Sequence, residues 1–322
     1  MARRTRYAPD RGLTVRMTVT MFLLGLVFVA FVALIIGIMT AANASGAAIV
    51  LVALIFGGGT AIISLFYSDK IALAAAGAVE VTPQQAPELH GIVDRLCALA
   101  DMDKPRVAIA PTQMPNAFAT GRNSKNSVLC VTEGLLSPRL GLEKEELEGI
   151  LAHELSHVAH KDVQVMTVAS LLAIVAALLV RFAFYSELFG GGRRGNDQNS
   201  FPIILVIMAV SAVVYAISFL LIRLLSRYRE LAADRSGALL TGQPSKLASA
   251  LQKVSSGMNR IPTEDLRTAQ PLNAFYFAPA MKLNAGASLS TLFSTHPSLE
   301  KRIEQLEKIQ RQLGQVAPGN PR

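Results

Sequence analysis

The chain has 322 residues, of which 51% are hydrophobic, and a mean hydropathy of +0.39. This hydrophobic content exceeds the usual range for soluble proteins, so the chain as a whole is not an ordinary water-soluble protein. The formal net charge is +8, and basic residues beside anionic lipid explain this excess without a nucleic-acid partner. The sequence also has no aromatic-basic RNA motif, no glycine-rich phosphate loop and no internal repeat.

The first part of the chain is hydrophobic. Residues 17–67 contain no charged side chain, and a polar break at 42–46 divides them into two spans, each long enough to cross a bilayer. The glycines at 57–59 would permit close helix packing. We expect a transmembrane hairpin here, after a basic cytosolic N-terminus at 1–16, because arginines favour the cytoplasmic side. The arginines are Arg3, Arg4, Arg6, Arg11 and Arg16.

A cytosolic domain is predicted over 68–162, where charged and turn-forming residues return. Residues 87–102 have the apolar periodicity of an amphipathic helix. Short strands separated by turn residues are predicted at 106–110, 116–120 and 127–131. A helix at about 142–160 follows and is expected to continue directly into the next hydrophobic segment. We expect no disulfide between Cys97 and Cys130, which are isolated thiols on the cytoplasmic side.

The predicted helix at 142–160 contains His153, Glu154 and His157 in the pattern H-E-x-x-H. Residues four apart lie on one helical face, so the two imidazoles can bind one zinc ion. Glu154 points about 100° away from His153 and can hold a water instead of the metal. Its place in the apolar stripe of the helix favours desolvation, as a general base near neutral pH requires. The alternative is a solvated helix with two surface histidines.

His160 is a candidate for the third ligand, because it lies on nearly the same face of the helix as His153. Seven residues rise about 10 Å along a straight helix, which is too far for one tetrahedral ion. The third ligand must therefore come from another part of the chain.

Two further uncharged runs lie in 163–222, separated by a glycine-rich polar loop at 186–200. They predict a second transmembrane hairpin with an exported loop, which makes four transmembrane helices in total. The chain then continues as a cytosolic helical domain at 223–313. The tail at 314–322 has the composition of a disordered segment.

The second hairpin returns the chain to the side of the membrane that carries the histidines. Glu230 follows this hairpin by about 12 Å of helix, and His157 precedes it by about 9 Å. We therefore predict that Glu230 is the third zinc ligand. Asp234, one helical turn later, would accept a hydrogen bond from a liganding imidazole. The alternative is that both acids pair with neighbouring arginines on a solvated helix.

Several motifs, in order, resemble the HtpX-type membrane zinc metalloproteases, relatives of the prenyl-protein CAAX protease. The resemblance covers about 80–305 and rests on Asn116-Ala-Phe-Ala-Thr-Gly121, Val131-Thr-Glu-Gly-Leu-Leu136, the His153–His157 motif, Arg229-Glu-Leu-Ala-Ala-Asp234, Thr295-His296-Pro297 and Arg302-Ile303.

The resemblance implies a mainly α-helical, integral membrane protein with a cytosolic zincin-like (gluzincin) domain that carries a small β-sheet. It also implies one zinc ion per chain, bound by His153, His157 and Glu230, with Glu154 as the base. The segment Asn116, Ala117, Phe118 and Ala119 would lie along the substrate cleft, where a peptide could add as a strand. For Asn116, a role at a turn or strand end is equally compatible with the pattern.

His296 has two compatible interpretations. The resemblance implies that it donates a hydrogen bond to the oxyanion of the scissile carbonyl. The local pattern predicts the start of a helix, since Pro297 suits a first helical position and an apolar stripe follows.

The function expected from these features is hydrolysis of peptide bonds by a zinc-activated water. The resemblance further implies quality control of misfolded membrane proteins or unfolded polypeptides, at the cytoplasmic face of the bacterial inner (plasma) membrane. The main alternative is a non-catalytic membrane scaffold or chaperone cofactor with a structural metal site. An intramembrane protease is disfavoured because charged residues surround the motif, and a transporter because the spans contain no acidic residue.

Overall fold

The computed structural model describes residues 11–41, 47–190, 200–258 and 296–315. Five predicted features lie wholly or partly outside these ranges. They are the arginines at 3, 4 and 6, the polar break at 42–46, most of the expected exported loop, residues 259–295 of the expected domain at 223–313, and most of the expected tail. The described part of the chain forms two compact units. Of the described residues, the helical unit contains 16–41, 47–65, 164–190 and 200–225, and the sheet unit contains 11–15, 66–163, 226–258 and 296–315.

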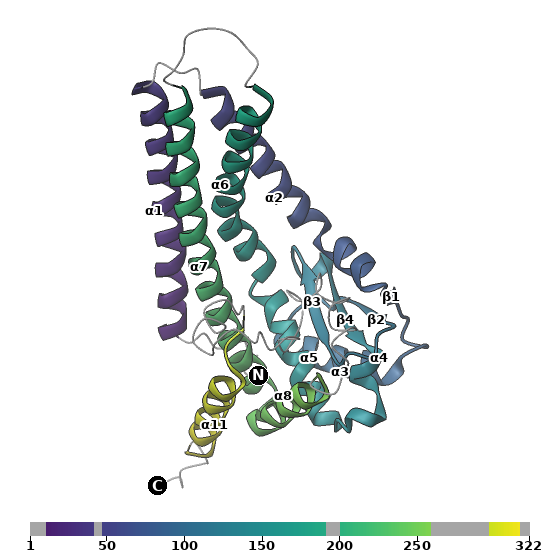
Figure 1. Cartoon of the computed structure of the whole chain (residues 1–322). Coiled ribbons are helices and arrows are strands. Elements are labelled where there is room, and N and C mark those ends of the chain that lie inside the picture. The colour runs from purple at the N-terminus through teal and green to yellow at the C-terminus, as the bar shows by residue number, and fades with distance from the viewer. Residues whose placement is uncertain (1–10, 42–46, 191–199, 259–295, 316–322) are drawn as a thin grey trace. The chain divides into compact units, whose positions relative to one another are not determined.

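All four hydrophobic segments are helical (Figure 1). They lie in α1 (Arg11–Ala41), α2 (Ala47–Ala76), α6 (Asp162–Gly190) and α7 (Ser200–Thr241). Among the described residues, Arg11–Ile38 and Leu205–Thr241 are each long and apolar enough to cross a membrane, and Lys144–Ala159 with Asp162–Leu178 would count as a bent third span.

The surface of the helical unit is strongly apolar. Phe22, Val29 and Val213 are exposed by 69%, 65% and 58% respectively, as expected for side chains that face lipid. Inside the unit, α1, α6 and α7 share a core of Leu24, Phe31, Ile35, Ala169, Val175, Ala176, Ile207 and Leu225. These features support a membrane protein.

Gly57 makes the close helix contact that the glycine run predicted. A Cβ at Gly57 would lie 2.7 Å from Cγ2 of Val175 on α6, so a larger residue would force the two helices apart. Gly58 and Gly59 have no such neighbour within 4 Å.

The sheet unit contains a four-stranded sheet with the order β1-β2-β4-β3. Its strands are β1 (Val79–Glu80), β2 (Arg106–Ala110), β3 (Ala117–Gly121) and β4 (Ser127–Thr132). β2 and β4 are parallel, and the two outer pairs are antiparallel. The three predicted strands are present within one residue of their expected bounds, whereas β1 is too short to leave a sequence pattern.

The helices of the sheet unit share one hydrophobic core with a face of the sheet (Figure 1). They are α3 (Pro87–Ala100), α4 (Glu133–Leu136), α5 (Lys144–Ala159), α8 (Pro244–Met258) and α11 (Leu299–Gln315), with 3-10 turns at Ser124–Asn126 and Pro138–Leu140. α5 packs on β3, α8 packs on α5, and α11 packs on α8. The opposite face is covered by the end of α2 through Ala72, Leu73 and Ala76.

The start of α5 is fixed by a capping box. Glu143 caps the helix, and the Glu146 carboxylate accepts a hydrogen bond from the Glu143 backbone N–H at 2.7 Å. Glu146 also accepts hydrogen bonds from Ser249 and Lys253 of α8 at 2.6 and 2.7 Å. The helix that carries the H-E-x-x-H motif is therefore anchored at its first turn.

The end of α5 differs from the sequence prediction. We expected one continuous helix into the third hydrophobic segment, but α5 ends at Ala159 and α6 begins at Asp162. Lys161, between them, has a left-handed backbone with φ of 57°. Left-handed backbone interrupts the hydrogen-bond ladder of a helix, so the chain changes direction immediately after the motif.

Candidate metal centre

Three side chains with metal-binding atoms lie together in the sheet unit. His153 and His157 on α5 face Glu230 on α7, and the ligand atoms all lie within 4.8 Å of one another. The two Nε2 atoms are 3.3 Å apart. Carboxylate oxygens of Glu230 lie 3.7 Å from Nε2 of His153 and 3.5 Å from Nε2 of His157. The residues that the two-hairpin argument paired are thus adjacent.

A glycine on α7 permits this approach of the two helices. A Cβ at Gly237 would lie 2.9 Å from the backbone nitrogen and 3.1 Å from Cα of His153. Backbone atoms cannot yield as a flexible side chain can, so a larger residue would push α7 away from α5. Glu230, on the same helix, would then move away from the imidazoles.

The outer nitrogen of each imidazole contacts a carboxylate. Nδ1 of His153 lies 2.9 Å from Oδ1 of Asp234, and Nδ1 of His157 lies 2.5 Å from Oδ2 of Asp162. Arg302 donates two hydrogen bonds to Asp234, at 2.6 and 2.8 Å. Arg229 forms an ion pair with Asp162.

These contacts decide which nitrogen of each ring carries the proton. An ionised carboxylate only accepts hydrogen bonds, so Nδ1 of His153 and of His157 must donate. In a neutral ring Nε2 then bears a lone pair, and both lone pairs meet the carboxylate of Glu230. Three electron-rich groups that converge in this way could hold a metal ion between them.

The spacing of the nitrogens also fits zinc. Two nitrogens about 2.05 Å from a tetrahedral zinc ion are about 3.3 Å apart, and the Nε2 atoms of His153 and His157 are 3.3 Å apart. Two imidazoles and one carboxylate are, in addition, a ligand set that leaves one position for water or substrate. The residues present therefore fit a catalytic zinc ion.

Burial keeps both histidines neutral. It lowers the pKa of His153 and of His157 to about 4, despite the opposing effects of Asp234 on His153 and of Glu230 on His157. Burial would raise the pKa of Glu230, but the facing histidines, with His296 first, hold it well below its usual range. Near neutral pH, the three groups are thus in the protonation states that bind a metal ion.

Glu154 lies beside this cluster and is 4% exposed. Burial, and next the charge of Glu230, raise the pKa of Glu154 well above its usual range. One of its carboxylate oxygens accepts a hydrogen bond from the backbone N–H of Ala119 on β3, at 3.2 Å. The desolvation inferred from the apolar stripe is therefore present in the folded protein.

His296 precedes α11 and is buried against the cluster. Its Nδ1 lies 2.9 Å from Oε2 of Glu230, and Pro297 and Ser298 lead into α11 at Leu299. The predicted helix start after His296 is confirmed, whereas its role at the oxyanion stays a prediction.

Asn116 immediately precedes the edge strand β3, and Ala117, Phe118 and Ala119 are its first three residues. The backbone of Asn116 is bonded to Thr132 at the end of β4. Phe118 is buried in the cluster that covers the other face of the sheet, so its side chain points away from the histidines. Ala117 and Ala119 belong to the face that bears α5.

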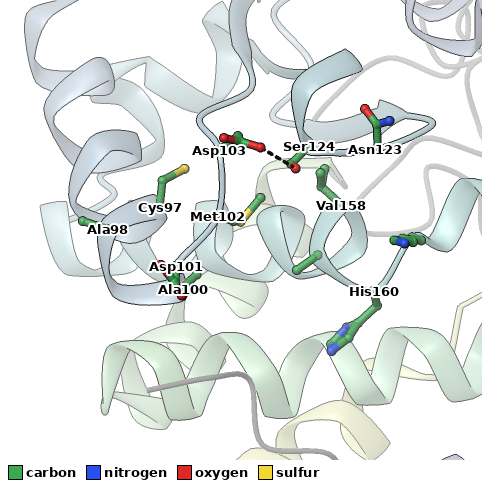
Figure 2. Close-up of a pocket in the computed structure, with 12 residues that line it drawn as sticks. Cys97, Ala98, Ala100, Asp101, Met102, Asp103, Asn123, Ser124, Val158 and His160 are labelled. Atoms are coloured by element: carbon green, nitrogen blue, oxygen red, sulfur yellow. Dashed lines mark hydrogen bonds between the residues drawn. The ribbon is translucent and has the colours of Figure 1, made fainter. Parts of the chain in front are cut away.

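His160 lies outside the cluster, as the helical rise predicted. Figure 2 shows it at a separate cavity of about 780 Å³ that is also lined by Cys97, Asp103, Ser124 and Val158. Cys97 and Cys130 are both free and buried, which agrees with the expected absence of a disulfide.

Two contacts to the cluster were missed by sequence reasoning. Asp162 contacts His157, although five residues on a continuous helix would place it about 140° around the axis. Arg302 was noted only as part of a motif, and its six-residue spacing from His296 carries no signal of the Asp234 contact. The break at Lys161 and the packing of α11 produce these contacts.

Comparison with known proteins identifies the family. The model of "Peptidase family M48" matches residues 83–310. The chain belongs to peptidase family M48. It is 58% identical over 316 residues to "Protease HtpX homolog 1" of Streptomyces coelicolor, covering 98% of this chain and 99% of the relative. It is 47% identical over 311 residues to "Protease HtpX homolog" of Moorella thermoacetica, covering 96% and 98%.

A solved structure supports the fold. The crystal structure of S. mikatae Ste24p matches with a TM-score of 0.55 at 16% identity, covering 91% of this chain and 67% of that chain. Family membership and the apolar helices make this protein a membrane-bound metalloprotease. The resemblance to the HtpX-type enzymes is confirmed, and the scaffold alternative is not favoured.

Proposed function

We propose that the chain is a zinc endopeptidase that holds one zinc ion between His153, His157 and Glu230. The observation that carries this proposal is that the two Nε2 atoms and the Glu230 carboxylate converge on one point. The Nδ1 atoms of His153 and His157 meanwhile contact the carboxylates of Asp234 and Asp162. A zinc ion in such a site supplies Lewis-acid chemistry, which polarises a carbonyl and makes a coordinated water more acidic.

Glu154 is the general acid and base of this proposal. It takes a proton from the attacking water and returns one to the leaving amine. Its burial suits both steps, because a carboxylate with a raised pKa accepts the proton of the water more readily and keeps it until the leaving nitrogen takes it as the C–N bond breaks. The hydrogen bond from Ala119 orients the carboxylate relative to β3.

Substitution of Glu154 tests the assignment. Glu154→Gln should retain one zinc per chain and lose about 10²–10⁴-fold in casein cleavage, the usual contribution of a general base. Glu145→Gln, at an exposed position on the same helix, is the matched control and should behave as wild type. Full cleavage by the Glu154 variant, or wild-type protein that binds no zinc, would refute the proposal.

Loss of the third ligand gives a second test. Glu230→Ala should abolish stoichiometric zinc binding, because two imidazoles alone leave the ion with half of its tetrahedral ligands. Metal analysis of the purified protein checks this outcome. Retention of zinc at the wild-type level would show that Glu230 is not a ligand.

Substrate would bind by addition to β3. Alternate backbone groups of a strand point in opposite directions, and the N–H of Ala119 points to Glu154 rather than to β4. Ala117 therefore directs its backbone groups to the same outer side, where a peptide could pair. Asn116 lies at the entrance of this strand. Phe118 would act through its backbone, since its side chain is in the core.

His296 would donate a hydrogen bond to the oxyanion of the scissile carbonyl. His296→Gln should then lower kcat by about 10²–10³-fold with zinc retained. If His296 instead serves only to hold Glu230, zinc affinity falls and kcat of the zinc-loaded enzyme is preserved. Kinetics and zinc affinity of the same preparation separate these two roles.

The topology that accompanies this proposal has four spans in two hairpins and an active site on the cytoplasmic face of the bacterial inner membrane. The parts are a cytosolic N-terminus at 1–16, hairpins at 17–67 and 163–222, cytosolic domains at 68–162 and 223–313, and a tail at 314–322. Uncharged runs and the basic N-terminus support it. Single cysteines placed at 42–46 and 191–199 should react with an impermeant thiol reagent added outside the cell, whereas one in the tail should not.

We also propose a role in quality control, with misfolded membrane proteins as substrates. Pairing with an edge strand requires an extended peptide, which unfolded segments provide and folded domains do not. Cleavage of an unfolded membrane protein at a rate well above that of its folded form would support this role. Equal rates for both forms would contradict it.

A further inference from the structure

We propose that Asp162 is a positioning residue for the metal site, which holds the ring of His157 and is itself held by Arg229. The inference rests on the proposed function, because it takes His157 as a metal ligand. It assigns a role to two residues for which the H-E-x-x-H pattern provides none.

The first step is that the two oxygens of the Asp162 carboxylate contact two different partners. Oδ2 lies 2.5 Å from Nδ1 of His157, and Oδ1 faces the guanidinium of Arg229. An ion pair that only joined two helices would need no contact with the imidazole. With Nδ1–H donated to Asp162, the ring of His157 presents its lone pair at Nε2, the atom that faces His153 and Glu230.

The second step is the backbone that makes this contact possible. On one continuous helix, Asp162 would lie about 140° around the axis from His157 and could not reach its ring. The left-handed Lys161 ends α5, and Asp162 begins α6. The break between the helices thus turns a residue from the wrong helical face toward the histidine.

The third step is the position of Arg229. It is 4% exposed and immediately precedes Glu230 on α7. Its ion pair with Asp162 therefore joins the start of α6 to the helical turn that carries the third ligand. Through this pair, the orientation of His157 and the position of Glu230 depend on each other.

The same arrangement occurs on the other histidine. His153 contacts Asp234, and Asp234 is paired with Arg302. The two imidazoles have the same kind of support, and its four residues come from α6, α7 and α11, which indicates that the support serves the imidazoles. Local packing alone would not require the repetition.

The test is the zinc affinity of the full-length protein in detergent, measured by competition with a chelator. Asp162→Asn should weaken zinc binding by about 10–100-fold, the usual effect of removing a partner of a metal-ligating histidine. Asp103→Asn is the matched control, because Asp103 is an exposed carboxylate bonded to Ser124 and should bind zinc as wild type. The visible spectrum of the cobalt(II)-substituted protein should shift in the Asp162 variant only.

Asp162→Asn leaves Arg229 buried without its ion-pair partner, so the single variant could fail to fold. The double variant Asp162→Asn, Arg229→Gln removes both buried charges, and it should fold and still show the loss of zinc affinity. Wild-type affinity and an unchanged cobalt spectrum in either folded variant would overturn the inference while leaving the proposed function intact. Wild-type protein without zinc would instead overturn the proposed function and this inference with it.

Discussion

His153 and His157 are each held by a carboxylate that is paired with an arginine, yet the two supports differ in burial. On the His153 side, Asp234 and Arg302 are 0% and 2% exposed, and the arginine donates both bonds of a bidentate pair. On the His157 side, the side chains of His157 and Asp162 are 16% and 12% exposed. The support of His153 is enclosed by protein, whereas in the support of His157 only Arg229 is equally buried and the Asp162 carboxylate is partly exposed.

The supports also differ in how the chain builds them. Asp234 follows Glu230 by one turn of α7, and Arg302 comes from α11. A second residue of α11, Gln305, donates a hydrogen bond to the backbone carbonyl of Leu231 on α7, at 2.7 Å. The support of His157 depends on a helix break at Lys161, four residues after the histidine, which lets Asp162 reach the ring. The first therefore depends on helix packing, and the second on a local change of backbone direction.

The largest expected effect is on folding, and it should differ between the two arginines. Arg302→Ala leaves Asp234 as an uncompensated charge in the protein interior and should destabilise the protein by about 3–5 kcal/mol. Arg229→Ala should cost about 1–3 kcal/mol, because water can reach Asp162. The midpoint of unfolding in detergent measures both.

Lys104→Ala, which breaks an ion pair with Asp94 at the surface, is the control and should have almost no effect. Equal losses for the two arginines would remove the distinction between the supports.

Zinc affinity should respond next. Asp234→Asn preserves the shape of the side chain and should weaken zinc binding by about 10–100-fold, an effect at least as large as that of Asp162→Asn. Competition with a chelator measures both variants under one condition. A smaller effect on the enclosed side would mean that burial does not determine how strongly a support acts.

The metal-free protein should be sensitive to acid because of both histidines. Burial lowers their pKa from 6.5 to about 4, so the unfolded chain binds more protons than the folded chain between these values. Their contribution to stability is complete above about pH 6.5 and is lost as the pH falls towards 4. The unfolding midpoint, measured with a chelator at about pH 7.5 and about pH 5, should fall. His153→Gln and His157→Gln should each reduce this pH dependence.

Burial also lowers the pKa of His160 to about 4, so a His160→Gln variant is the necessary control. Equal midpoints at both pH values would contradict the neutral, buried state of the rings.

The smallest expected effect concerns the backbone on the His157 side. Lys161→Gly should retain zinc affinity, because glycine adopts the left-handed conformation without a steric penalty. Lys161→Val should destabilise this conformation by about 1–2 kcal/mol and weaken zinc binding. Zinc affinity of the two variants, measured side by side, checks the prediction. Retention in Lys161→Val would show that the helix break is not needed to orient His157.

Much of the fold followed from local patterns. The uncharged runs predicted four helices, and alternation with turn residues predicted three of the four strands. The H-E-x-x-H spacing placed two imidazoles on one face of a helix, and the two-hairpin arrangement pointed to Glu230. Asp162 and Arg302 could not be predicted in this way, because neither lies at a helical spacing from the residue that it contacts.

The sequence by itself determined that an amphipathic helix carries a histidine pair and that two uncharged runs separate it from a distant carboxylate, because helix periodicity and uncharged length depend only on residues close together in the chain. The tertiary structure decided how these ligands are held. Gly237 lets α7 meet the backbone of His153, Lys161 turns Asp162 back to His157, and α11 brings Arg302 to Asp234. Each of these contacts depends on the direction in which a segment leaves its helix or on what packs against it, and neither is encoded in residue spacing.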